Sequence, residues 1–266
     1  MRRIATGLVL GLAWFLLLFY GSFSLFWAVL LLLSAAALFE YAGLLQRRAG
    51  GDHVLTLILL GLLPTIGAYF GRIEPVTAGL VLALLLLFAL TLCRFGMLGN
   101  GFDFVGRGTF GIVYGGLLPA HLVLIMARPH GAAWLAVLTG LIFASDTGAY
   151  YSGRLFGRHK LCPAISPGKT VEGFLGGLLA GVAAGTGLGR LLVPGSHLLP
   201  LALAALLVTC VGVMGDLLES VLKRSVAVKD SGALLPGHGG ILDRADSLLV
   251  AAPVFYYLMV WGLITG

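Results

Sequence analysis

Three aspartates in an otherwise apolar sequence are the first candidates for chemistry. Asp216 interrupts a long apolar run, and Asp243 and Asp246 follow it with a spacing of three. An uncompensated carboxylate at membrane depth costs on the order of a few kcal/mol, so Asp216 needs a neutralising partner. If a helix begins near Asp243, both later carboxylates project toward one side of its first turn. Because carboxylate oxygens suit Mg²⁺, the three acids together predict a metal site.

A glycine-rich turn and several basic residues lie among these acids. The turn, residues 236–240, reads Pro-Gly-His-Gly-Gly, which lets the backbone pass close to a ligand and point its amides inward. We therefore predict that His238 contacts a phosphate. Simple salt bridging is the alternative for the charged residues, although salt bridges need neither the glycines nor the histidine. The cations of this stretch are Lys223, Arg224, Lys229 and Arg244.

A second polar segment, residues 145–173, begins with Ser145 and Asp146 and continues to Gly173. Its Gly168-Lys169-Thr170 string invites comparison with a P-loop, but that motif requires a glycine at position 163, where this chain has Pro163. A Walker A site is therefore excluded. What remains is a polar loop rich in Lys and Arg, suited to binding phosphates. A loop whose charge only fixes its side of the membrane is the alternative.

The composition places these residues in a membrane protein. Apolar residues make up 59% of the 266 positions and charged residues 11%, and the mean hydropathy is +1.03, far outside the range of soluble domains. A spanning helix needs roughly 17–25 apolar residues. We predict an all-α polytopic protein with about nine transmembrane helices, the first run being split by a turn near residues 20–22. The charge-free runs are 4–39, 54–71, 75–93, 108–127, 129–145, 173–189, 191–215 and 247–266.

Basic residues are divided unevenly between the two sides that nine spans define. Twelve lie in the loops after spans 2, 4, 6 and 8, and five lie on the other side. Because cytoplasmic loops carry the excess of Lys and Arg, we expect these loops and the C-terminus in the cytoplasm and the N-terminus outside a bacterial-type inner (plasma) membrane. Met1-Arg2-Arg3 also resembles the start of a secretory signal. No small-x-small cleavage site follows near residue 20, so we expect a retained anchor.

The net charge of +6 would suggest nucleic acid in a soluble domain. In a membrane protein the same excess is explained by inside loops that lie against anionic headgroups and hold anionic substrates, so we expect no nucleic-acid partner. The three cysteines, at 93, 162 and 210, have no spacing that indicates a zinc site or a disulfide framework.

Chemistry is expected in the second half of the chain, because seven of the eleven acidic residues lie from Asp146 onward. We therefore divide a single transmembrane domain, 1–266, into a membrane scaffold at 1–140 and a catalytic region at 141–266 with two cytoplasmic polar loops. A four-residue spacing of glycines draws one stripe along a helix and predicts close packing, either within the chain or in a homodimer. These glycines stand at 173, 177, 181, 185 and 189.

Residues 220–246 resemble the signature of the phosphatidate cytidylyltransferases, also called CDP-diacylglycerol synthases. The matching positions are the Ser-x-Leu-Lys-Arg start at 220, Lys229-Asp230, Pro236-x-His238-Gly239-Gly240 and Asp243-Arg244-x-Asp246. Ser-Asp-Thr-Gly-Ala-Tyr at 145–150 and Ser-Pro-Gly-Lys-Thr at 166–170 also resemble that family. The resemblance is strong over residues 145–250 and elsewhere rests on hydropathy and length.

This resemblance implies an enzyme that converts CTP and phosphatidate to CDP-diacylglycerol and pyrophosphate with Mg²⁺, alone or with a second cation. No covalent protein intermediate is needed. Asp216 and Asp243 would hold Mg²⁺, with Asp246 and Asp146 as further ligands or supports. The implied catalytic residues are Asp216, Asp243, Asp246, Lys169 and His238. The implied substrate-binding residues are Lys223, Arg224, Lys229, Arg244, Ser166, Asp146, Gly239 and Gly240.

Two other functions stay open at the level of sequence. A CTP-dependent polyprenol or phytol kinase would have a related loop but transfer the γ-phosphoryl group. A secondary transporter also places acids in spans, but near the midplane, whereas most of these acids lie at predicted cytoplasmic ends. A CDP-alcohol phosphotransferase is excluded, because it would need an Asp-Gly-x-x-Ala-Arg string that is absent.

Overall fold

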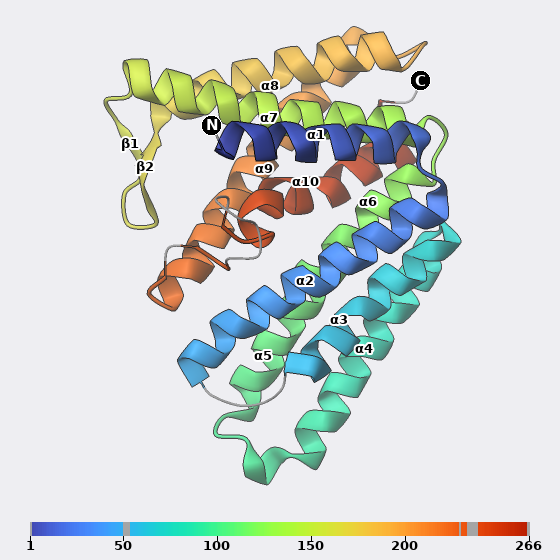
Figure 1. Cartoon of the computed structure of the whole chain (residues 1–266), viewed down its shortest axis with the longest axis vertical. Helices are drawn as coiled ribbons and strands as arrows, with labels where there is room; N and C mark the ends of the chain where they lie inside the picture. The colour runs from blue at the N-terminus through green and yellow to red at the C-terminus, as the bar shows by residue number, and fades with distance from the viewer. Residues whose placement is uncertain (1, 50–53, 229, 233–238, 265–266) are drawn as a thin grey trace. The chain divides into compact units, whose positions relative to one another are not determined.

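The computed structural model describes residues 2–49, 54–228, 230–232 and 239–264, and the side chains of these ranges except at 2–6 and 46–49. Helices dominate the described chain (Figure 1). They are α1 (Arg2–Tyr20), α2 (Phe23–Ala49), α3 (Val54–Gly67), η1 (Ala68–Phe70), α4 (Ile73–Cys93), η2 (Phe95–Met97), α5 (Gly101–Ile112), the π-helix η3 (Val113–Leu117), α6 (Leu118–Met126), α7 (Gly131–Phe156), α8 (Val171–Leu192), α9 (Leu198–Ser225) and α10 (Leu242–Val260).

Each charge-free run predicted to span the membrane forms helix in the described chain, and the predicted turn at residues 20–22 separates α1 from α2. Among the described residues, six helical segments are long and apolar enough to cross a membrane, which supports an integral membrane protein but does not confirm nine spans. The apolar parts of α1 and α3 are shorter, and α10 begins with three charged residues. The six segments are Phe23–Leu45, Ile73–Cys93, Gly101–Met126, Gly131–Phe156, Val171–Leu192 and Leu198–Ser225.

The helices form two compact units, each described here by itself. The first contains Met1–Ala127 and Val228–Arg244, and the second contains Arg128–Ala227 and Ala245–Gly266. The predicted division after residue 140 lies inside α7. The described residues between 228 and 244 fold with the helices of the predicted scaffold, although the sequence placed them in the predicted catalytic region.

In the first unit, backbones approach closely where α3 meets the π-helix η3. A Cβ atom on Gly116 would lie 1.9 Å from the carbonyl oxygen of Gly61, so only glycine fits there. The Thr65 hydroxyl donates a hydrogen bond to the Gly116 carbonyl at 2.9 Å. This bond satisfies polar groups within an apolar layer, where an unmet hydrogen bond is costly. The unit is thus built by direct backbone packing as well as by leucine side chains.

In the second unit, α7 and α8 pack along each other, and α9 packs on α8 (Figure 1). The predicted glycine stripe of α8 is buried at every position. Gly177 faces Ser145 and Ala149 of α7, and Gly181 faces Thr209 of α9. The stripe therefore packs within the chain, which is the first of the two alternatives that the sequence left open.

Between α7 and α8 lies a β-hairpin that departs from the all-α prediction. Its strands, β1 (Lys160–Cys162) and β2 (Ser166–Thr170), pair antiparallel with Lys160 opposite Thr170. Strands of this length give no clear alternation of side chains, and Pro167 and Gly168 are residues that strands usually avoid, so the hairpin was not predictable from pattern. At its end the Thr170 hydroxyl accepts a hydrogen bond from the Gly173 amide at 3.1 Å and caps α8.

Substituting alanine in the glycine stripe tests this packing. A Cβ atom on Gly181 would lie 2.5 Å from the Thr209 hydroxyl oxygen, whereas one on Gly187, on the exposed side of the same helix, would meet nothing within 4 Å. Overpacking typically costs about 1–3 kcal/mol, so Gly181→Ala is expected to lower the melting temperature of the detergent-solubilised protein. Gly187→Ala is the matched control and is expected not to lower it. Equal melting temperatures for both variants would contradict the packing described.

Candidate functional site

An ion pair in the second unit joins the two polar segments recognised in the sequence. Lys169 Nζ lies 2.6 Å from Asp216 Oδ2, and both side chains are partly exposed. Strand β2 carries the lysine, and α9 carries the aspartate one turn before its charged end. The neutralising partner that Asp216 was expected to need is therefore Lys169.

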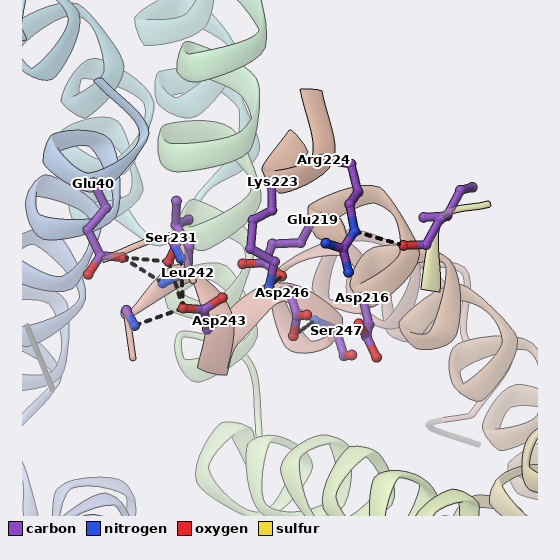
Figure 2. A network of polar contacts seen from close by, with 12 residues as sticks. Glu40, Asp216, Glu219, Lys223, Arg224, Ser231, Leu242, Asp243, Asp246 and Ser247 are labelled. Atoms are coloured by element: carbon purple, nitrogen blue, oxygen red, sulfur yellow. Dashed lines mark hydrogen bonds and ion pairs between the residues drawn. The ribbon is translucent and has the colours of Figure 1, made fainter. Parts of the chain in front are cut away.

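Close packing of α9 against α10 brings a second carboxylate to this place. Gly215 precedes Asp216, and a Cβ atom there would lie 2.6 Å from the backbone oxygen of Asp246. The glycine lets the two helices approach until the charges of Asp216 and Asp246 act on each other. Figure 2 shows Asp246 and the adjacent Ser247 beside Asp216. The predicted association of these two acids is thus present in the structure.

Burial governs the ionisation of Asp246, of which only 9% is exposed. Desolvation, together with the negative charges of Asp216 and Asp146, raises the pKa of this carboxyl to about 7 against lowering contributions from the Ser247 amide and Lys223. The Ser247 amide donates to Asp246 Oδ1 at 2.7 Å. Asp146, on α7, also interacts electrostatically with Asp216 and Lys169. Three carboxylates and the ammonium groups of two lysines therefore share one neighbourhood.

The basic end of α9 makes two further contacts within this unit. Lys223 forms an ion pair with Glu219, one turn earlier and only 2% exposed. Arg224 Nε donates to the Ile165 carbonyl at 3.4 Å, in the turn between β1 and β2 (Figure 2). Glu219 was not among the predicted site residues, although its four-residue spacing from Lys223 was a usable signal. Lys223 therefore forms a salt bridge, as the alternative interpretation of the basic residues predicted.

A carboxylate at the start of α8 holds the other end of the hairpin. Glu172 accepts hydrogen bonds from the backbone amides of Arg158 and His159, and its Oε1 lies 2.6 Å from His159 Nδ1. Sequence analysis did not assign Glu172 a role. Because the hairpin also carries Lys169, this contact helps to hold the lysine in place.

In the first unit, Asp243 binds the backbone of its own segment. Its Oδ2 accepts hydrogen bonds from the Ser231 amide and hydroxyl, both at 3.0 Å, and from the Gly240 amide at 2.8 Å. Gly239 has a φ of +84°, a conformation that favours glycine. The Gly240 amide, predicted to bind phosphate, donates to the Asp243 carboxylate in this structure, and its contact with a phosphate stays a prediction.

Glu40 of α2 is the residue of this segment's surroundings that sequence analysis missed. It is 4% exposed and accepts hydrogen bonds from Ser231, Ile241 and Leu242 (Figure 2). A carboxylate in a long apolar helix was the available signal, since such a group needs partners. The remaining predicted positions add little. Ser166 lies at the start of β2, Arg244 follows Asp243 in α10, and Lys229 and His238 lie outside the described residues.

The acids of the second unit fit Mg²⁺ only as a partial ligand set. Within the ranges that the structure describes, no three His, Cys, Asp or Glu side chains converge as a metal-binding group. Mg²⁺, however, is usually held by one or two carboxylates together with waters and substrate phosphates. Asp216 and Asp246 supply hard oxygen donors whose mutual repulsion a cation would relieve. These two carboxylates therefore suit a Mg²⁺ ion whose remaining ligands would come from the substrate phosphates.

Comparison with known proteins identifies the family of this chain. The profile of a family described as "Cytidylyltransferase family" matches residues 1–261. A Bacillus subtilis (strain 168) protein named phosphatidate cytidylyltransferase is 35% identical over 269 aligned residues, covering 97% of both chains. A Helicobacter pylori protein of the same name is 35% identical over 97% of this chain and 93% of its own. One from Pseudomonas aeruginosa is 44% identical over 55% of this chain and 56% of its own.

Removing the Glu172 carboxylate tests how the hairpin is held. In Glu172→Ala we expect the amides of Arg158 and His159 to lose their acceptors and exchange with deuterium faster, while the cores of α7 and α8 stay protected. Hydrogen exchange followed by mass spectrometry measures this. Glu74→Ala is the control, because Glu74 is exposed and lies 3.8 Å from Arg72. Unchanged exchange at 158–159 would show that Glu172 does not hold the hairpin.

Proposed function

This chain belongs to the cytidylyltransferase family, and we propose that it is a phosphatidate cytidylyltransferase, which converts CTP and phosphatidate to CDP-diacylglycerol and pyrophosphate. The observation that carries this proposal is the neighbourhood of Lys169, Asp216 and Asp246, which joins the two sequence segments that resemble such enzymes. The proposed role is one step of phospholipid biosynthesis.

The proposed reaction brings two anions together. An oxygen of the phosphatidate phosphate attacks the α-phosphorus of CTP, the bond from that phosphorus to the bridging oxygen breaks, and pyrophosphate leaves with the electron pair. Such transfers depend on positioning and on charge neutralisation more than on covalent chemistry by the protein. The site therefore needs fixed positive charges and a means of keeping the two phosphates in line.

The second unit supplies such charges at defined places. Lys169 is held by Asp216, and Lys223 is held by Glu219, so both ammonium groups are positioned before substrate arrives. A lysine ammonium has three donors, so each can keep its carboxylate and still donate to a phosphate oxygen. We assign these two lysines to the CTP phosphates. Arg224, which contacts the hairpin turn, is assigned to the same phosphates.

Mg²⁺ is part of the proposal. Asp216 and Asp246 would hold it, with Asp146 as a further ligand or as a support for them, and it would neutralise the charge of the transferred phosphates. A second cation and direct ligation by Asp243 remain predictions. So do phosphate contacts from Lys229, His238, Arg244, Ser166, Gly239 and Gly240.

The apolar helices and the basic loops together indicate where the protein lies in the membrane. Six apolar helices support an integral membrane protein. We further propose the bacterial inner membrane with the site facing the cytoplasm, where CTP is found and where the excess of basic loop residues is expected. Diacyl chains leave a bilayer only at great cost, so phosphatidate should enter from the inner leaflet. A homodimer remains a proposal without a packing argument, because the glycine stripe is used within the chain.

The position of the label distinguishes the proposed reaction from its rivals. Purified protein in mixed micelles receives Mg²⁺, CTP labelled either at the α- or at the γ-phosphorus, and one acceptor lipid, which is phosphatidate, a polyprenol or phytol. We expect α-label to enter the organic phase and γ-label to leave as pyrophosphate. Transfer of γ-label to a polyprenol or phytol acceptor would replace the proposal with a kinase. No transfer by well-folded protein would reject an enzyme of either kind and favour a transporter.

Coupling between Lys169 and Asp216 tests the ion pair within that reaction. We expect Lys169→Met and Asp216→Asn each to lower kcat/KM by about 100-fold or more, as for groups that stabilise developing charge. Because the two side chains act as one unit, the double variant should lose far less than the product of the two single losses. Lys160→Met, on the neighbouring strand of the hairpin, is the control and should retain activity. Multiplicative losses would show that the two residues act independently.

A further inference from the structure

Glu40 is a buried carboxylate in a part of the chain to which the sequence assigns no chemistry. It lies on α2, is 4% exposed, and stands in one of the most apolar segments of the protein. Burying a carboxyl group without hydrogen-bond partners is costly, so a glutamate at this depth indicates a specific use. Its partners identify that use.

Among the described residues, Glu40 accepts hydrogen bonds from the segment that leads into α10. The amide of Ile241 donates to Oε1 at 3.0 Å, and the amide of Leu242 donates to Oε2 at 3.1 Å. The first amides of a helix have no acceptor within it, and a carboxylate at that end also interacts favourably with the helix dipole. Glu40 therefore caps α10 from a different helix, about two hundred positions away in sequence.

A single serine connects Glu40 to Asp243. The Ser231 hydroxyl oxygen lies 3.2 Å from Glu40 Oε2 and 3.0 Å from Asp243 Oδ2. A serine hydroxyl carries one proton, so it donates to one of the two carboxylates at a time while remaining in contact with both. The amides of Ser231 and Gly240 also donate to Asp243 Oδ2. The position of Asp243 thus depends on a segment that Glu40 holds.

The shape of the surrounding backbone is adapted to this carboxylate. A Cβ atom on Gly232 would lie 2.5 Å from Glu40 Oε1, and one on Gly240 would lie 2.5 Å from Oε2 and 2.1 Å from the Ser231 hydroxyl oxygen. Two glycines of the signature segment therefore make room for Glu40 itself. The need to accommodate Glu40 therefore explains why glycine stands at these two positions without reference to a bound phosphate.

We propose that Glu40 is a positioning residue of the reaction, which fixes Ser231 and residues 240–242 and thereby sets the orientation of the Asp243 carboxylate. The proposal rests on the proposed cytidylyl transfer for its effect on rate. In this proposal Glu40 itself touches neither substrate nor metal. Through Glu40, the predicted scaffold half of the chain directly supports the signature segment.

The test compares Glu40→Ala and Ser231→Ala with Glu74→Ala, an exposed glutamate of α4, as the control. Removing groups that orient a functional ligand typically costs about 10–100-fold in activity. We expect both variants to lose activity in this range as a fall in kcat, measured on monodisperse protein, while the control does not. Ser231→Ala leaves α2 unaltered, so it keeps the test valid if Glu40→Ala fails to fold.

Two readouts separate positioning from general stability. In a double-mutant cycle, Glu40→Ala with Ser231→Ala should be little worse than either alone, because both act through the same contact to Asp243. Hydrogen exchange should accelerate at residues 231 and 240–242 and stay unchanged in the core of α3 and α4. Full activity, multiplicative losses or unchanged exchange at these amides would each overturn the proposal.

The exchange measurement also keeps this inference distinct from the proposed function. If the wild-type protein transfers no cytidylyl group but the amides at 240–242 still lose protection in Glu40→Ala, the proposed reaction fails and the cap stands. If the wild-type protein is active and those amides are unaffected, the reaction stands and the positioning role fails.

Discussion

The need to neutralise carboxylates inside an apolar chain organises this structure. Three of the buried or half-buried acids show this most directly. Asp216 pairs with Lys169, Glu219 pairs with Lys223, and Glu40 accepts amide hydrogens at the start of α10. In a low-dielectric surrounding each such contact is stronger than in water, and the loss of one partner is correspondingly costly. Because the partners lie on different elements, satisfying the acids also brings distant segments together.

Glycine makes these contacts geometrically possible. Gly215 lets α9 approach α10 beside Asp246, Gly232 and Gly240 leave room for Glu40, and the stripe on α8 allows α7 and α9 to pack against it. Helices in membranes gain little from the hydrophobic effect between them, so close backbone approach and polar contacts provide much of their specificity. The glycines and the acids are therefore parts of one packing solution. The ion pairs that hold Lys169 and Lys223 also join neighbouring parts of the helices and the hairpin.

Most of the helices and several of the site acids were predictable from the sequence. The contacts and elements that were not predicted were missed for physical reasons. Charge-free runs located the helices, since apolar length is a strong signal. An acid that interrupts an apolar run pointed to Asp216, and the signature segment pointed to Asp246. The partner of Asp216 was not predictable, because Lys169 is brought to it by tertiary packing rather than by spacing. Glu40 was grouped with the scaffold, because a lone acid in an apolar run shows that it needs partners but not which ones. The hairpin was too short to leave a pattern.

The central claim is that Asp216 and Asp246 hold Mg²⁺ together with the phosphates of CTP. Binding of CTP to purified protein, measured by calorimetry with and without Mg²⁺, tests it most directly when the wild type is compared with Asp216→Asn and Asp246→Asn. The claim predicts that Mg²⁺ strengthens CTP binding to the wild type and that either substitution removes this strengthening. Mg²⁺-dependent CTP binding that is as strong in both variants as in the wild type would contradict it.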